Sequence, residues 1–131
     1  MIHGDESAAI ADTSFFIARE QGRPLGPHPS TLGVSIITLG ELRLGVLATA
    51  DPKLRAQRLN TLLQVDSLNP LPIDRPVANA WARLVLDLRA IGRRMPINDS
   101  WIAATAIARQ LPVVSQDADY DGVPGLQVMR V

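Results

Sequence analysis

The stretch AAIADTS, residues 8–14, joins a short apolar run to an acid and two hydroxyl residues. The run Ala8–Ala11 is typical of a buried strand, and the polar residues after it can cap a short helix over 15–19. A second run of this kind, PVVS at 112–115, is followed two residues later by Asp117. Two such runs, each ending near an acid, indicate neighbouring strands of one sheet.

Between these two runs the spacing of apolar residues predicts helices over 34–50, 51–68, 74–91 and 99–110. Asp51, Asp74 and Asn98 are placed to cap the last three of these helices. The Gly- and Pro-rich segment 20–33 predicts a surface loop, 71–73 a short edge strand and 126–131 a last strand. Strands that alternate with helices in this order predict an α/β fold with a mainly parallel sheet.

Composition narrows the possible functions. The chain of 131 residues and 14.2 kDa fits one domain, 1–131, and its net charge is zero, which argues against a strongly basic nucleic-acid coat. Without cysteine it has no disulfide, catalytic thiol or cysteine-bound metal, and only His3 and His28 supply imidazole. No secretion signal or long apolar run is visible, so we expect a cytoplasmic protein.

Four acids stand at informative places in this pattern. Asp12 and Asp117 should emerge at the same edge of a parallel sheet, Asp99 opens a helix, and Glu41 lies within one. Taken singly, each is better explained as a helix cap, a partner of a helix dipole, a turn residue or an exposed residue. Taken together at about 5 Å, they would repel by about 3 kcal/mol per pair at an effective dielectric of about 20. Such a cluster needs a cation, and oxygen ligands without His or Cys favour Mg²⁺ or Mn²⁺.

The four segments that carry these acids resemble, in order, the four motifs of PIN-domain proteins. They are IADTS at 10–14, ITLGELRLG at 37–45, PINDSWIAATA at 96–106 and VVSQDADY at 113–120. Order, spacing and chain length are similar to the VapC toxins of bacterial toxin–antitoxin pairs. One departure is Gln116, which stands where the family usually has arginine.

The resemblance implies a PIN-like fold, a three-layer sandwich with a parallel sheet between helices, and one acidic pocket lined by Asp12, Glu41, Asp99 and Asp117. By this analogy Asp12, Asp99 and Asp117 bind Mg²⁺, with Mn²⁺ as a substitute, and Glu41 positions water. Asp119 is a further candidate ligand. Three hydroxyl residues beside these acids would orient carboxylates or water, or serve only as caps and strand-end hydrogen bonds: Thr13, Ser14 and Ser115.

RNA that approaches an acidic pocket needs neutralising cations, and Arg43, Arg93 and Arg94 are placed to contact phosphates or to remain solvated. Trp101 has the helical spacing of a core residue, although a tryptophan can also stack on a base. The segment 23–29, rich in proline, has no assigned role.

The function that the resemblance implies is a Mg²⁺-dependent endoribonuclease, the toxin of a type II pair, held inactive by a VapB-like antitoxin. We expect a homodimer without membrane contact, and an antitoxin that covers apolar surface on the helices within 34–68. One alternative is a metal-dependent phosphatase or phosphotransferase, disfavoured because no second acid stands two positions after Asp12 and no suitably placed lysine follows. The other is a non-catalytic PIN-like binding module, which would be free to lose its acids.

Overall fold

A four-stranded parallel sheet forms the centre of the protein, whose computed structural model describes residues 8–131. The strands are β1 (Ala8–Ala11), β2 (Thr31–Gly33), β3 (Val113–Ser115) and β4 (Val128–Arg130). Their order across the sheet is β2-β1-β3-β4, and every pair is parallel. The prediction of an α/β fold with a parallel sheet is confirmed.

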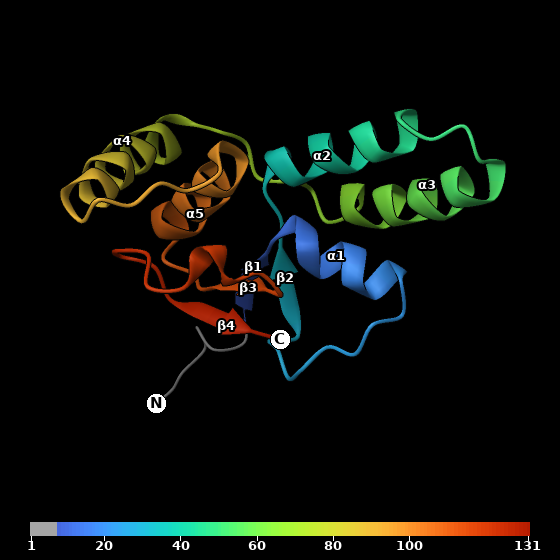
Figure 1. Ribbon diagram of the computed structural model, residues 1–131, viewed down its shortest axis with the longest axis horizontal. Helices are drawn as coiled ribbons and strands as arrows, with labels where there is room; N and C mark the ends of the chain where they lie inside the picture. Colours follow the sequence, from blue (N-terminus) through green and yellow to red (C-terminus); the bar gives the residue numbers. More distant parts are fainter. Residues whose placement is uncertain (1–7) are drawn as a thin grey trace.

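Helices cover both faces of this sheet and give three layers (Figure 1). On one side lie α1 (Thr13–Glu20), α2 (Ile36–Leu47) and α3 (Pro52–Asp66). On the other lie α4 (Arg75–Ala90) and α5 (Ile97–Arg109) with the short 3₁₀ turn η2 (Ala118–Tyr120).

Alternation along β1 explains the two apolar cores. Ala9 and Ala11 face the core shared with α1, α2 and α3, whereas Ile10 faces the core shared with α4 and α5. Successive side chains of a strand point to opposite faces, so a central strand covered on both faces is apolar throughout. All three of these side chains are fully buried.

Three local predictions are wrong. The segment predicted as a loop over 20–33 ends in the edge strand β2, which pairs with β1. The segment 71–73 is not a strand, because only Leu71 joins Ser35 in an isolated bridge. Asn98 does not cap α5, which begins two residues earlier than predicted, at Ile97 after Pro96, and has no side-chain cap. Asp51 and Asp74 do cap α3 and α4 as predicted.

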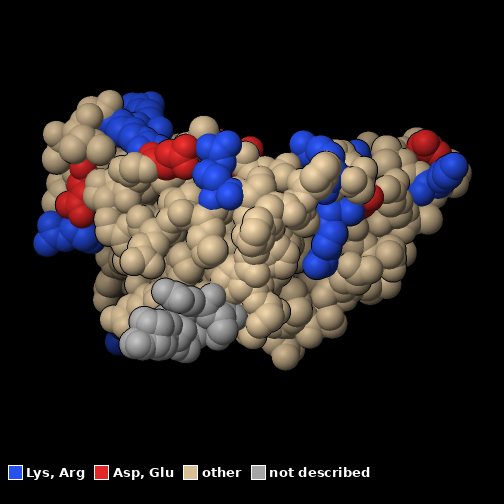
Figure 2. Space-filling view, turned by 90° about the horizontal axis from the view of Figure 1, so that it is seen from below, with Lys and Arg blue, Asp and Glu red and all other residues tan. Residues whose placement is uncertain are grey.

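The charged side chains are unevenly distributed over the surface. Figure 2 shows a face on which most of the basic and acidic side chains lie in the upper part of the view, above a broad uncharged area. None of the described helices is long and apolar enough to span a membrane. His3 lies outside the described residues.

Candidate active site

Asp12 lies at the carboxyl end of β1 and is 2% exposed. Its Oδ1 accepts hydrogen bonds from the Phe15 backbone N–H at 3.0 Å and the Ser14 hydroxyl at 2.8 Å. Its Oδ2 accepts one from the Ser115 hydroxyl at 2.8 Å. The same residue therefore caps α1, as expected, and ties the ends of β1 and β3 together. Burial raises the pKa of Asp12, and the nearby charge of Asp117 adds to the effect.

The end of β3 is organised by the same two serines. Ser115 Oγ accepts a hydrogen bond from the Asp117 backbone N–H at 2.8 Å, and Ser14 Oγ accepts one from the Gln116 N–H at 3.1 Å. The parallel register places Ala11 opposite Val114, so that Asp12 and Ser115 meet at the edge. The expectation that Asp12 and Asp117 leave the sheet at one edge is confirmed.

Glu41 is held between two elements. Its Oε1 accepts a hydrogen bond from the Thr13 hydroxyl at 2.6 Å, and its Oε2 accepts one from the Asn98 amide at 3.3 Å. Thr13 follows Asp12 and Asn98 precedes Asp99, so these two bonds fix the Glu41 carboxylate between the two motifs that carry the aspartates.

The structure brings three further carboxylates together. Asp99, Asp117 and Asp119 each offer an oxygen, and these oxygens lie within 4.8 Å of one another. Burial raises the pKa of Asp99 from its usual 3.8 to about 7, with further contributions from its hydrogen bond with Asp119 and from the charges of Asp119 and Asp12. Asp12 is not one of these three residues, but its charge acts on Asp99.

Tyr120 contacts the acidic cluster through Asp99, which lies on α5. Its hydroxyl donates to Asp99 Oδ1 at 3.2 Å, and its side chain is fully buried. Burial and the charges of Asp12 and Asp99 raise the pKa of Tyr120, so it stays protonated and remains a donor. This bond favours the ionised form of Asp99 and partly opposes the effect of burial.

The predicted arginines differ in how they are engaged. Arg93 donates to the backbone carbonyls of Asp119, at 2.7 Å, and of Asp121. It therefore holds the η2 segment that carries one acid of the cluster. Arg43 on α2 and Arg94 before α5 are exposed, and no ion pair within residues 8–131 engages either.

Two residues with polar roles at the site were not selected from the sequence, namely Tyr120 and Asn98. Both lie inside motifs that carry an acid, but their contacts depend on helices that pack from elsewhere in the chain. Gln116 also acquires a structural explanation, because its amide donates to the carbonyls of Pro24 and Val131, both at 3.2 Å. The Pro-rich segment is thus tied to the chain end.

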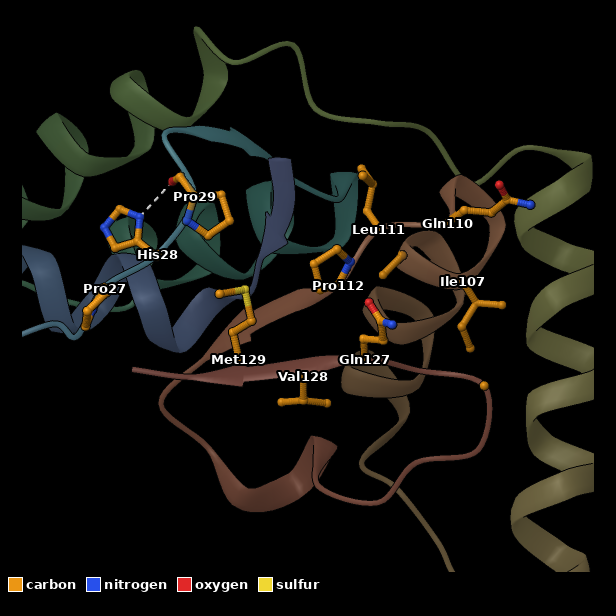
Figure 3. A pocket seen from close by; sticks show the side chains of 12 residues that line it. Pro27, His28, Pro29, Ile107, Gln110, Leu111, Pro112, Gln127, Val128 and Met129 are labelled. Carbon is orange, nitrogen blue, oxygen red and sulfur yellow. Dashed lines mark hydrogen bonds between the residues drawn. The ribbon is translucent and has the colours of Figure 1, made fainter. Parts of the chain in front are cut away.

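A cavity of about 930 Å³ lies at the end of the strands that is opposite to the acids (Figure 3). Pro112 and Gln127, which line it, precede β3 and β4, whereas the acids follow β1 and β3. The His28 ring on its wall is hydrogen-bonded to the Pro29 carbonyl at 2.9 Å and packs edge-on against Phe15. No acid lines this cavity among the described residues, so it is not the site that the four motifs build.

Comparison with known proteins agrees with this geometry. The model of the PIN domain family matches residues 9–126, which is most of the chain. The protein belongs to the PIN-domain family.

Its relatives narrow the class further. The chain is 47% identical over 130 residues to Ribonuclease VapC5 of Mycobacterium tuberculosis, covering 95% of this chain and 96% of that protein. It is 48% identical over 125 residues to Ribonuclease VapC4 of the same organism, covering 94% and 96%. The crystal structure of VapBC-5 from M. tuberculosis superposes with a TM-score of 0.85 at 44% identity, over 95% of this chain and 99% of that one. Within the PIN-domain family, the chain is a member of the VapC ribonucleases, as its four motifs predict.

The raised pKa of Asp99 predicts how the stability of the metal-free protein depends on pH. The folded state keeps this proton up to about pH 7, whereas the unfolded chain loses it near 3.8. Between these values the folded state binds more protons, so the free energy of unfolding falls as pH rises. Asp99→Asn cannot ionise, so in urea unfolding with EDTA its free energy of unfolding should exceed that of the parent by about 1 kcal/mol at pH 8. The difference should shrink as the pH falls and vanish below 3.8, where Asp99 is protonated in both states of the parent.

The matched control is Asp66→Asn, which removes an acid from an exposed position at the end of α3. This control should follow the parent's pH profile. Parallel profiles for the parent and Asp99→Asn would contradict the raised pKa of Asp99.

Proposed function

We propose that the protein is a cytoplasmic, divalent-metal-dependent endoribonuclease that hydrolyses RNA phosphodiester bonds and slows growth as the toxin of a toxin–antitoxin pair. The observation that carries the proposal is the convergence of Asp99, Asp117 and Asp119 beside the buried Asp12. Membership of the VapC ribonucleases supports the activity. An aspartate-nucleophile phosphatase is not favoured, because the residue two positions after Asp12 is Ser14 and not a second acid.

The donor set fits a hard divalent cation. All candidate ligands are carboxylate oxygens, the chemistry that Mg²⁺ and Mn²⁺ prefer. Asp12 can contribute as well: Ser14, Phe15 and Ser115 supply three protons to a carboxylate with about four lone-pair positions, which leaves one for a metal. We therefore assign Asp12, Asp99 and Asp117 as ligands and Asp119 as a further ligand or a partner of Asp99.

The other residues act on orientation and charge. When bound, Mg²⁺ would neutralise the carboxylates and polarise the phosphodiester group. Thr13 and Asn98 fix the Glu41 carboxylate so that it can orient a water or accept its proton. Ser14 and Ser115 orient Asp12, and Tyr120 orients Asp99. Arg43 and Arg94 are free to contact phosphates, whereas Arg93 acts mainly by holding the backbone around Asp119.

A partner surface lies on α2 and α3. A groove of about 290 Å³ runs between them, lined by Ile36, Leu39 and Leu63 among others, with Arg43 and Asp66 beside them. Leu44 and Leu47 on α2 are 66% and 68% exposed. Apolar exposure of this extent marks an interaction site. We propose that the VapB-like antitoxin covers this groove, and that the protein forms a homodimer, as the family resemblance implies.

Removing the charge of Asp99 should separate catalysis from folding. With Mg²⁺ or Mn²⁺, Asp99→Asn should cleave total RNA more slowly than the parent by about a hundredfold or more, because even supporting groups of a metal site cost tenfold to a hundredfold. The melting temperature of the variant should also rise less than the parent's when metal is added, since a ligand stabilises in proportion to its binding.

Asp66→Asn is again the control and should cleave like the parent. Retained cleavage in Asp99→Asn would remove this residue from the metal site. A parent that cleaves no RNA with either metal would instead point to the non-catalytic binding module.

The proposed antitoxin surface between α2 and α3 can be tested by asking whether the antitoxin still relieves the toxicity of variants in the groove. Expression of the parent should slow bacterial growth, and co-expression of the product of the adjacent short reading frame should restore it. Leu63→Asp places a charge in the groove, so it should weaken binding of that product by about tenfold or more and remain toxic during co-expression. Leu86→Asp is the control on α4, where Leu86 is 55% exposed against 58% for Leu63; this control should be neutralised. Equal neutralisation of both variants would exclude the groove.

A further inference from the structure

A separate cavity of about 550 Å³ opens between the end of α4, the segment 92–95 and the start of α5. Its apolar lining includes Val85 and Leu88 from α4, Met95 from the connecting segment and Ile97 from α5. Leu88 is buried and Ile97 is 66% exposed, so the cavity passes from the core to an open mouth. This volume is within the range of small-molecule pockets.

An aromatic side chain is fixed against this cavity. Trp81 lines it, and its ring stacks on Trp101 with centroids 4.4 Å apart and planes inclined by 6°. The Trp81 Nε1–H donates to Ser100 Oγ at 3.0 Å, and the Ser100 hydroxyl donates to the Ile97 carbonyl at 2.6 Å. Stacking and hydrogen bonding therefore orient the indole in advance, at no further entropic cost on binding.

Cations surround the mouth of the cavity. Arg89 and Arg94 line it and are exposed, and no ion pair in the described part of the chain occupies them. Arg93, the third arginine of the lining, is bonded to the carbonyls of Asp119 and Asp121. The arrangement of apolar walls, a fixed indole and unpaired guanidinium groups complements a base with its phosphate.

The cavity also adjoins the acidic cluster. Ile97 and Ser100, which line it, flank Asp99 in the first turn of α5. Arg93 connects its wall to the backbone of Asp119, a second acid of the cluster. A chain of nucleotides with one phosphodiester at the acids thus has a neighbouring position at the cavity.

We propose that this cavity is a base-binding subsite, in which a nucleotide of single-stranded RNA beside the scissile phosphate places its base against Trp81 and its phosphate between Arg89 and Arg94. The inference rests on the proposed ribonuclease function. It assigns a selective role to residues outside the acidic cluster, since the dimensions of the cavity limit which base can enter. A peptide without acidic side chains would use the apolar walls but leave the two arginines without partners.

The tryptophans provide a direct readout, because Trp81 and Trp101 are the only two in the chain. The parent protein in EDTA and low salt, where cleavage is blocked, is titrated with the four homotrinucleotides of A, C, G and U. At least one should quench tryptophan fluorescence saturably.

Val85→Phe, which fills the cavity, should weaken this binding by about tenfold, the scale of one base–aromatic contact. Leu86→Phe adds the same ring at the next position, which does not line the cavity, and should bind like the parent.

Arg94→Ala keeps the test valid if Val85→Phe does not fold. It should weaken binding and flatten its salt dependence. Arg83→Ala should do neither, because Arg83 is an exposed residue of α4 that pairs with Asp87 and does not line the cavity. The proposal would be overturned if the parent shows no saturable quenching. It would also be overturned if Val85→Phe and Leu86→Phe are quenched equally and Arg94→Ala binds like the parent. Fluorescence that changes with protein concentration and not with RNA would also overturn it, since a second copy would then occupy the cavity. Quenching without any cleavage in Mg²⁺ would support the subsite and count against the ribonuclease function alone.

Discussion

The buried carboxylate of Asp12 is the interaction on which the rest of the site depends. A carboxylate that is 2% exposed is costly unless hydrogen bonds replace its water, and here Ser14, Phe15 and Ser115 do so. These same bonds begin α1 and join β1 to β3, so the fold and the site share them. Replacing Ser115 would therefore affect the sheet edge and the position of Asp117 together.

Charge at this edge works against the metal-free fold. Burial, together with the hydrogen bond from Asp119 and the charges of Asp119 and Asp12, raises the pKa of Asp99 to about 7. Tyr120 and the two serines moderate the cost of ionising these acids without removing it. In the proposed ribonuclease, a bound cation would relieve this repulsion, and its binding energy would then also stabilise the fold.

Sequence alone could predict the central features, because they depend on local pattern. The apolar runs of β1 and β3 are each followed within two residues by an acid, so both strands and both acids can be found from short stretches of sequence. The four motifs then identify the family. The edge strand β2 could not be found, since its three residues follow a Pro-rich segment and are held by pairing with β1. The roles of Asn98 and Tyr120 were equally hidden: each depends on a partner, Glu41 or Asp99, that only the packing of α5 brings within reach.

The most direct test of this account is anomalous diffraction at the manganese edge from crystals of the protein grown with Mn²⁺. We expect a peak bonded to carboxylate oxygens of Asp99 and Asp117, with Asp12 completing the set through its remaining lone pair. The position of the peak would also distinguish a ligand from a supporting role for Asp119. A peak at another place in the molecule, or none at this edge of the sheet at saturating Mn²⁺, would contradict the claim that these acids converge to hold a metal.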